Sequence, residues 1–130
     1  MANLIPAAST LLCATSDYME QELLPTLEGY HRFQTRVAIN VLRTVMREIE
    51  LAAGLDQTEV ERLQALLGRA GTLAELTADL SARLADGRMA LDAAGLVDHL
   101  RLTLAGALAI DNPKWIASDS PALPDPRTLK

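Results

Sequence analysis

The sequence predicts an all-α fold, a compact bundle of about five helices followed by an extended, proline-rich C-terminal tail. The 130 residues are 49% hydrophobic but only 3% aromatic, so the core must consist of aliphatic side chains, which suits closely packed helices. Apolar residues recur at helical spacing along most of the chain, and capping residues and glycines divide it into segments. We expect residues 1–113 to form a single helical domain and residues 114–130 to form the tail.

The first helix is expected from Pro6 to Leu24. Proline suits the first helical position, where its missing N–H costs nothing. Pro25 disfavours helical geometry at the residue before it and therefore ends or kinks the helix. The apolar positions that follow the helical period are Leu4, Ala8, Leu11, Leu12, Thr15, Met19 and Leu23.

The second helix is expected from Tyr30 to Ala53, with Gly54 as its C-terminal stop. It would be the longest element and the spine of the fold. Its predicted core face consists of Phe33, Val37, Val41, Leu42, Val45, Met46 and Ile49.

The charge reverses between these two helices. Residues 1–28 carry four acidic residues and no Lys or Arg, whereas residues 29–47 carry four arginines and no Asp or Glu. Opposite charges on neighbouring helices attract. We therefore expect the first two helices to form an antiparallel pair.

Two capping boxes mark the next two helices. Asp56, followed three residues later by Glu59, predicts a helix that ends at Gly68. Thr72 with Glu75 predicts another helix that stops at Asp86-Gly87.

The fifth helix is expected from Asp92 to Ile110. A leucine at every fourth residue predicts an apolar face that packs across the second helix, and Gly106 would allow another helix to approach closely. Asn112-Pro113 ends this helix, because a residue before proline avoids the helical region. The repeated leucines are Leu96, Leu100, Leu104 and Leu108.

Composition excludes several functional classes. The net charge of −5 argues against binding to nucleic acid or to an anionic membrane, which both require a basic surface. No apolar run approaches the roughly 20 residues of a membrane span. The single cysteine, Cys13, excludes an internal disulfide, and we expect a cytoplasmic protein without a signal peptide.

No known catalytic or cofactor motif stands in the sequence. There is no nucleophile elbow, zinc motif or dinucleotide fingerprint, and neither His31 nor His99 has another ligand at metal-binding spacing. We therefore expect no cofactor, no metal site and no identifiable catalytic residue.

The leading candidate for a ligand-binding site is a polar stripe on the second helix. Spacings of four, three and four place Arg36, Asn40, Arg43 and Arg47 on one face. Arginine forks beside an amide can grip a carboxylate or phosphate. The alternative is that these arginines pair with acidic residues of the first helix or lie in solvent.

A second candidate lies where the fifth helix ends. Asp111 and Asn112 either form a simple helix stop or form the edge of a site that faces the arginine stripe. The sharpest expectation is that Arg36 pairs with Asp111, or failing that with Glu22, and that Asn40 bonds to the 110–113 backbone. Arg36→Ala would then destabilise the fold several times more than Arg62→Ala.

Three segments together resemble a known family. They are Leu23-Leu24-Pro25-Thr26-Leu27-Glu28-Gly29, Phe33-Gln34-Thr35-Arg36-Val37-Ala38-Ile39-Asn40-Val41-Leu42 and Leu108-Ala109-Ile110-Asp111-Asn112-Pro113. They resemble a small uncharacterised bacterial helical family whose members occur alone, or beside or fused to aminoglycoside-phosphotransferase-like kinases, with acyl-CoA dehydrogenases as frequent neighbours. The resemblance covers roughly residues 5–115 and implies an accessory role, without any established activity.

Two hypotheses of function follow. The first is a non-enzymatic accessory or protein-interaction module that binds a protein partner or forms a homodimer, and that serves a kinase-like or acyl-CoA-metabolising enzyme. The second is a binding protein or small enzyme for an anionic metabolite, phosphorylated or CoA-linked. In the second hypothesis the polar stripe of the second helix holds the anion, and Asp111 is the only candidate acid or base.

Overall fold

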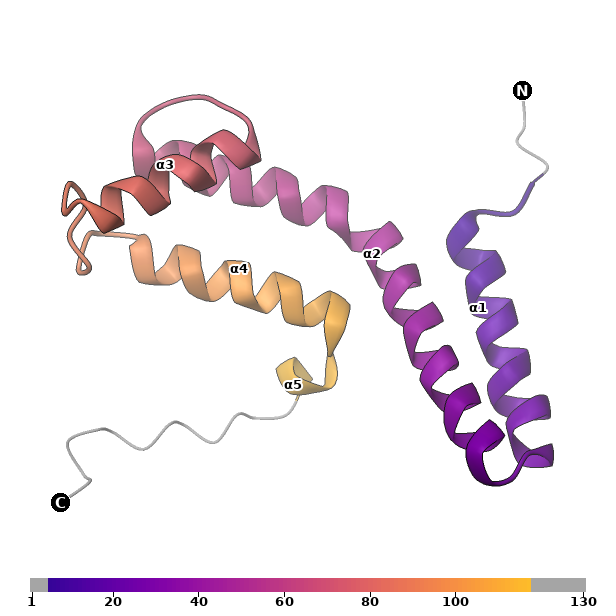
Figure 1. Ribbon diagram of the computed structural model, residues 1–130. Helices are drawn as coiled ribbons and strands as arrows, with labels where there is room; N and C mark the ends of the chain where they lie inside the picture. The colour runs from indigo at the N-terminus through magenta and orange to yellow at the C-terminus, as the bar shows by residue number, and fades with distance from the viewer. Residues whose placement is uncertain (1–4, 118–130) are drawn as a thin grey trace, which may run out of the picture.

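A computed structural model of the chain describes residues 5–117 and confirms the all-α prediction. The described part contains helices and no strand (Figure 1). Most of the predicted proline-rich tail, residues 118–130, lies outside the described residues. The helices are α1 (Ala8–Tyr18), α2 (Gly29–Leu67), α3 (Leu73–Ala85), α4 (Leu96–Asp111) and α5 (Lys114–Ala117).

Helix α2 is the spine around which the other helices are arranged. Helix α1 runs antiparallel to the N-terminal half of α2, as predicted, while α3 and α4 pack on its C-terminal half (Figure 1). Between α1 and α2 the chain tightens from a π-helical turn, Met19–Leu23, into a 3₁₀ turn, Leu24–Thr26. Pro25 lies inside this last turn, which completes the reversal.

The prediction of a helix boundary at Gly54 is wrong. Residues expected to form two helices are one α-helix of 39 residues, and Gly54 lies in its interior without the positive φ of a helix-ending glycine. Asp56 consequently caps no helix. A glycine inside a helix costs about 1 kcal/mol, and we attribute its tolerance to α4, whose Gly106 packs against Leu55 beside it. Gly106 thus allows the close approach that was predicted.

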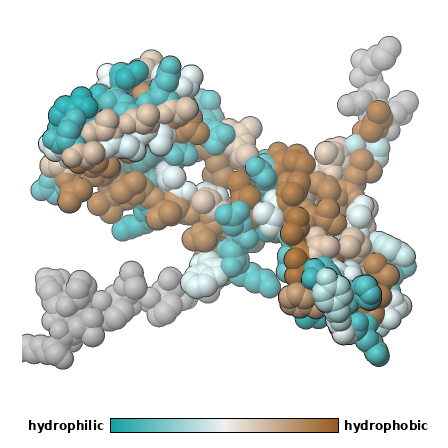
Figure 2. All heavy atoms as spheres, viewed as in Figure 1, coloured by the Kyte–Doolittle hydropathy of each residue, from teal (hydrophilic) through white to brown (hydrophobic). Residues whose placement is uncertain are grey.

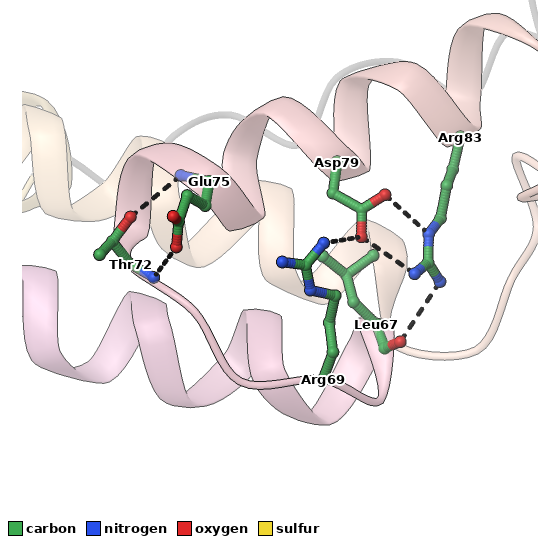
Figure 3. Close-up of polar contacts among 6 residues, drawn as sticks. All are labelled: Leu67, Arg69, Thr72, Glu75, Asp79 and Arg83. Carbon is green, nitrogen blue, oxygen red and sulfur yellow. Dashed lines mark hydrogen bonds and ion pairs between the residues drawn. The ribbon is translucent and has the colours of Figure 1, made fainter.

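The capping box at the start of α3 is confirmed. The Glu75 N–H donates to Thr72 Oγ1 at 3.3 Å, and the Thr72 N–H donates to Glu75 Oε2 at 2.9 Å (Figure 3). Gly68, with φ of 69°, ends α2 in the left-handed conformation. The turn between α2 and α3 therefore follows the local signals that the sequence carries.

Helix α4 begins later than predicted. Its N-cap is Gly95, which has φ of 85°, and Asp92 lies outside the helix. Its end at Asp111, followed by Asn112-Pro113, agrees with the prediction to one residue. The tail was expected to be non-helical from Lys114 onward, whereas Lys114–Ala117 form the short helix α5.

The core lies among the C-terminal half of α2, α3 and α4. Five buried leucines from these three helices pack together, and partly buried residues such as Val60 and Leu84 surround them. The arm formed by α1 and the N-terminal half of α2 buries less, since Ser16, Leu24 and Ile39 are its buried residues. The core leucines are Leu63, Leu67, Leu76, Leu80 and Leu96.

The predicted core faces of α2 and α4 are largely wrong. In the arm, Ile39 is buried and Leu42 and Met46 are partly buried, whereas the remaining predicted positions of α2 are exposed. Of the leucine repeat in α4, only Leu96 is buried. Both helices carry apolar residues on more than one side, and packing buried a side other than the predicted one.

Candidate functional site

The opposite charges of the first two helices meet at Arg43. Its guanidinium bonds both carboxylate oxygens of Glu20 and lies 3.6 Å from Asp17 Oδ1. The Arg43 hydrogen bonds are the main reason that the pKa of Glu20 lies below its usual range. One predicted ligand-binding arginine therefore holds α1 against α2, as in the alternative interpretation of the stripe.

Arg36 and Asn40 do not form the predicted clamp. Both side chains are exposed, and neither forms a hydrogen bond or ion pair with another of residues 5–117. The predicted pairing of Arg36 with Asp111 or Glu22, and that of Asn40 with the 110–113 backbone, are therefore wrong. Helix α1 packs against the side of α2 that carries Ile39. Arg36 lies on another side of α2 and therefore faces solvent.

Arg47 ties α2 to the end of α4 instead. Its Nε–H donates to the main-chain carbonyl of Ile110 at 2.6 Å, and Nη2 bonds Thr44 Oγ1 at 3.2 Å. Asn112, the predicted neighbour of the stripe, is the C-cap of α4, and its N–H donates to the carbonyl of Leu108 at 2.8 Å. The predicted contact between these two regions exists, but it uses a residue three turns further along α2 than Arg36.

A groove of about 410 Å³ separates the middle of α2 from α4, and Asp111 lines it. Four carboxylates and one guanidinium, that of Arg62, line this space, so it favours a cationic group over an anion. Arg36, Asn40, Arg43 and Asn112 are not among its lining residues, so the structure does not gather the predicted site residues. The four acidic residues that line the groove are Glu48, Asp56, Glu59 and Asp111.

A polar cluster of Arg62, His99 and Thr103 lies between α2 and α4. The Arg62 Nε–H donates to His99 Nδ1 at 3.4 Å, and its Nη2 bonds Thr103 Oγ1 at 3.2 Å. Burial of His99, followed by the charge of Arg62, lowers the pKa of the imidazole, which favours the neutral form that can accept a hydrogen bond from the guanidinium. This arrangement satisfies a buried polar group, and none of its members was a predicted site residue.

The signal for this cluster was the polar side of α4. His99, Thr103 and Gly106 recur at spacings of four and three, which places them on one face. That face points toward α2, whereas Val97, Leu100, Leu104 and Leu108 are exposed to solvent. The leucine repeat led to the prediction that the Leu100–Leu104–Leu108 side of α4 is buried, and this prediction is wrong.

Two apolar surfaces remain uncovered in the described part of the chain. We call the first the apolar α2 stripe, which consists of Tyr30, Phe33, Val37, Val41, Val45 and Ile49. We call the second the outer α4 face, which consists of Val97, Leu100, Leu104 and Leu108. Figure 2 shows hydrophobic residues gathered over the arm of α1 and α2 and along α4. Contiguous exposed apolar patches of this kind mark interaction sites.

Catalytic groups do not converge on either surface. Cys13 is exposed, and the neighbouring Asp17 carboxylate raises the pKa of its thiol, which disfavours the nucleophilic thiolate. Within residues 5–117 no group of three or more His, Cys, Asp or Glu side chains could hold a metal ion. No helix in that range combines the length and the apolar character that a membrane crossing requires.

Comparison with known proteins adds one finding. The family model of a domain of unknown function, DUF6285, matches residues 25–115. This range begins at Pro25, in the turn before α2, and includes α2, α3 and α4, together with both apolar surfaces. No similar curated protein and no similar solved structure was found.

Proposed function

This chain belongs to the DUF6285 family, and we propose that it is a non-enzymatic accessory module that binds a partner protein through the outer α4 face. The observation that carries the proposal is the inverted polarity of α4. The helix turns polar and small residues such as Thr103 and Gly106 toward α2, and it exposes Leu104 at 65%. A surface helix ordinarily does the reverse.

The outer α4 face suits a groove or a second helix on a partner. Its residues follow spacings of three, four and four, the pattern by which an amphipathic helix presents anchors to an apolar partner. The resemblance to a family found beside kinase-like proteins and acyl-CoA dehydrogenases directs the choice of partner. We therefore place the module with a kinase-like or acyl-CoA-metabolising enzyme.

The test is co-purification from co-expression with a kinase-like protein, and separately with an acyl-CoA dehydrogenase, followed by titration calorimetry of any pair. Leu104→Glu should abolish binding, because it places a charge in the middle of the apolar face. Leu91→Glu is the matched control, since Leu91 is 80% exposed outside α4, and it should bind like the wild type. Binding that survives Leu104→Glu would refute this use of the face.

The alternative function, binding or conversion of an anionic metabolite, finds less support. Arg43 is engaged by Glu20, and four of the five charged residues that line the groove beside Asp111, that residue included, are carboxylates. Thermal-shift measurements against acyl-CoAs and nucleotides decide between the two functions, because a selective ligand raises the melting temperature. We expect no shift. A shift that Arg36→Ala removes would favour the alternative.

A further inference from the structure

A pocket of about 260 Å³ lies between the C-terminal part of α2 and the first two turns of α4. Its walls are mostly aliphatic, and the polar side chains of Arg62, Asp98 and His99 also line it. No residue of the outer α4 face belongs to the lining, so the pocket is separate from the surface proposed to bind a partner protein. The remaining lining residues are Ala65, Leu66, Ala94, Gly95 and Leu102.

His99 places a hydrogen-bond donor in this pocket. The residue is only 5% exposed, and its Nδ1 accepts from Arg62. A neutral imidazole that accepts at Nδ1 carries its proton on Nε2. Nε2 has no hydrogen-bond partner among residues 5–117, whereas every fully enclosed side-chain nitrogen or oxygen in that range has one. Nε2 is therefore reached from the pocket, where its N–H lacks an acceptor.

Arg62 and Asp98 bring one charge of each sign to the same pocket. The Asp98 carboxylate is exposed and has no hydrogen bond or ion pair within the described part of the chain. Arg62 uses Nε for His99 and Nη2 for Thr103, and its Nη1 is unpaired in that part of the chain. The pocket thus combines donors, an anionic acceptor and an aliphatic wall.

We propose that this pocket binds a free aliphatic α-amino acid of about the size of leucine. The ligand carboxylate accepts from His99 Nε2–H and interacts with Arg62, the ammonium group pairs with Asp98, and the side chain lies against Leu66 and Leu102. An anion without an ammonium group would face Asp98 unpaired, and a cation without a carboxylate would leave the Nε2–H unsatisfied. The volume lies below the roughly 300 Å³ at which pockets for drug-sized ligands begin, so the ligand must be small.

Imidazole NMR reads the pocket directly, because the chain has two histidines. L-Leucine titrated into the full chain should move the ring signals of His99 in a saturable manner, while the exposed His31 is the internal control. The two matched probes are 4-methylpentanoate, which is leucine without its amino group, and 3-methylbutylamine, which is leucine without its carboxylate. Each should bind by roughly tenfold or more weakly, the equivalent of one lost charged hydrogen bond. No saturable change at His99, or binding of either probe as tight as that of L-leucine, would overturn the inference.

The role of Asp98 is tested by removing its charge alone. Asp98→Asn should weaken the binding of L-leucine by roughly tenfold or more without weakening that of 4-methylpentanoate, because only the ammonium group loses its partner. Asp92→Asn is the matched control, since Asp92 is exposed in the segment before α4 and does not line the pocket. An equal loss in both variants would attribute the effect to net charge and refute the assigned pairing.

A pocket-filling variant covers the case in which the polar change alters the fold. Ala94→Leu adds an apolar side chain to the lining and should abolish the binding of L-leucine, with unchanged helicity by circular dichroism. Ala53→Leu, on an exposed part of α2 outside the pocket, should bind L-leucine like the wild type, as should Leu104→Glu. Binding that survives Ala94→Leu would overturn the inference, whereas the effect of Leu104→Glu on a partner enzyme bears on the proposed function alone.

Discussion

Arg47 donates a hydrogen bond from Nε–H to the main-chain carbonyl of Ile110 at 2.6 Å, across 63 residues of sequence. The bond satisfies a carbonyl in the last turn of α4, where helical partners run out. Among the described residues it joins the arm to the end of α4.

We predict that Arg47→Ala lowers the free energy of unfolding by about 1.5–3 kcal/mol, the usual range for a lost hydrogen bond to a charged group. Arg36→Ala is the matched control, because Arg36 lies on the same helix without a side-chain partner in residues 5–117, and it should change stability by less than about 0.5 kcal/mol. Urea denaturation measures both variants. Equal effects would show that the Ile110 contact contributes nothing.

The free energy of unfolding should fall as the pH drops below about 6.5, because His99 is buried with a lowered pKa. Its pKa is lowered in the folded state, chiefly by burial, while the unfolded residue titrates near about 6.5. As the pH falls below that value, the unfolded state takes up a proton that the folded state rejects, and stability declines.

His99→Gln, which keeps an acceptor for Arg62, should therefore lose less stability than the wild type between about pH 7 and pH 5. The carboxylates with lowered pKa values, such as Asp79 beside Arg83, lose their contribution only below their ordinary range and do so in both proteins. Parallel stability curves across this interval would contradict a lowered His99 pKa.

Gly54 offers a test of the continuous α2 helix. No atom would lie within 4 Å of a Cβ added there, and its backbone is helical. Gly54→Ala should stabilise the protein by about 0.4–1 kcal/mol, because alanine loses less freedom on folding.

Gly68→Ala is the opposite control. Gly68 has φ of 69°, so alanine there should cost about 1–2 kcal/mol. If Gly54 instead ended a helix, as the sequence predicted, both substitutions would destabilise. Thermal unfolding monitored by circular dichroism separates the two outcomes.

The two predicted capping boxes should differ in their mutational effect. Thr72→Ala removes the acceptor for the Glu75 N–H and should cost about 1 kcal/mol. Asp56→Ala should change stability by less than about 0.5 kcal/mol, because Asp56 lies within α2 and caps nothing. A loss of similar size at Asp56 would indicate a helix start that the structure does not contain.

Local signals in the sequence predicted several helix boundaries correctly, although those at Gly54, Asp56 and Asp92 failed. Thr72 and Glu75 start α3, Gly68 ends α2, and Asn112-Pro113 ends α4, all as predicted. The charge reversal also predicted the pairing of α1 with α2, which the contacts of Arg43 with Asp17 of α1 and with Glu20 of the following turn confirm.

Tertiary structure decided which face of each helix is buried and whether Gly54 interrupts α2. Periodicity predicted the Val41 face of α2 and the Leu104 face of α4, whereas packing buried Ile39 and turned Thr103 toward α2. A glycine inside a helix weighs only about 1 kcal/mol, and the packing of a neighbouring helix outweighs it. The way in which α1 and α4 pack on α2 keeps Arg36 away from Asp111 and brings Arg47 to Ile110. Contacts between segments distant in sequence depend on how helices pack, and no local signal encodes that packing.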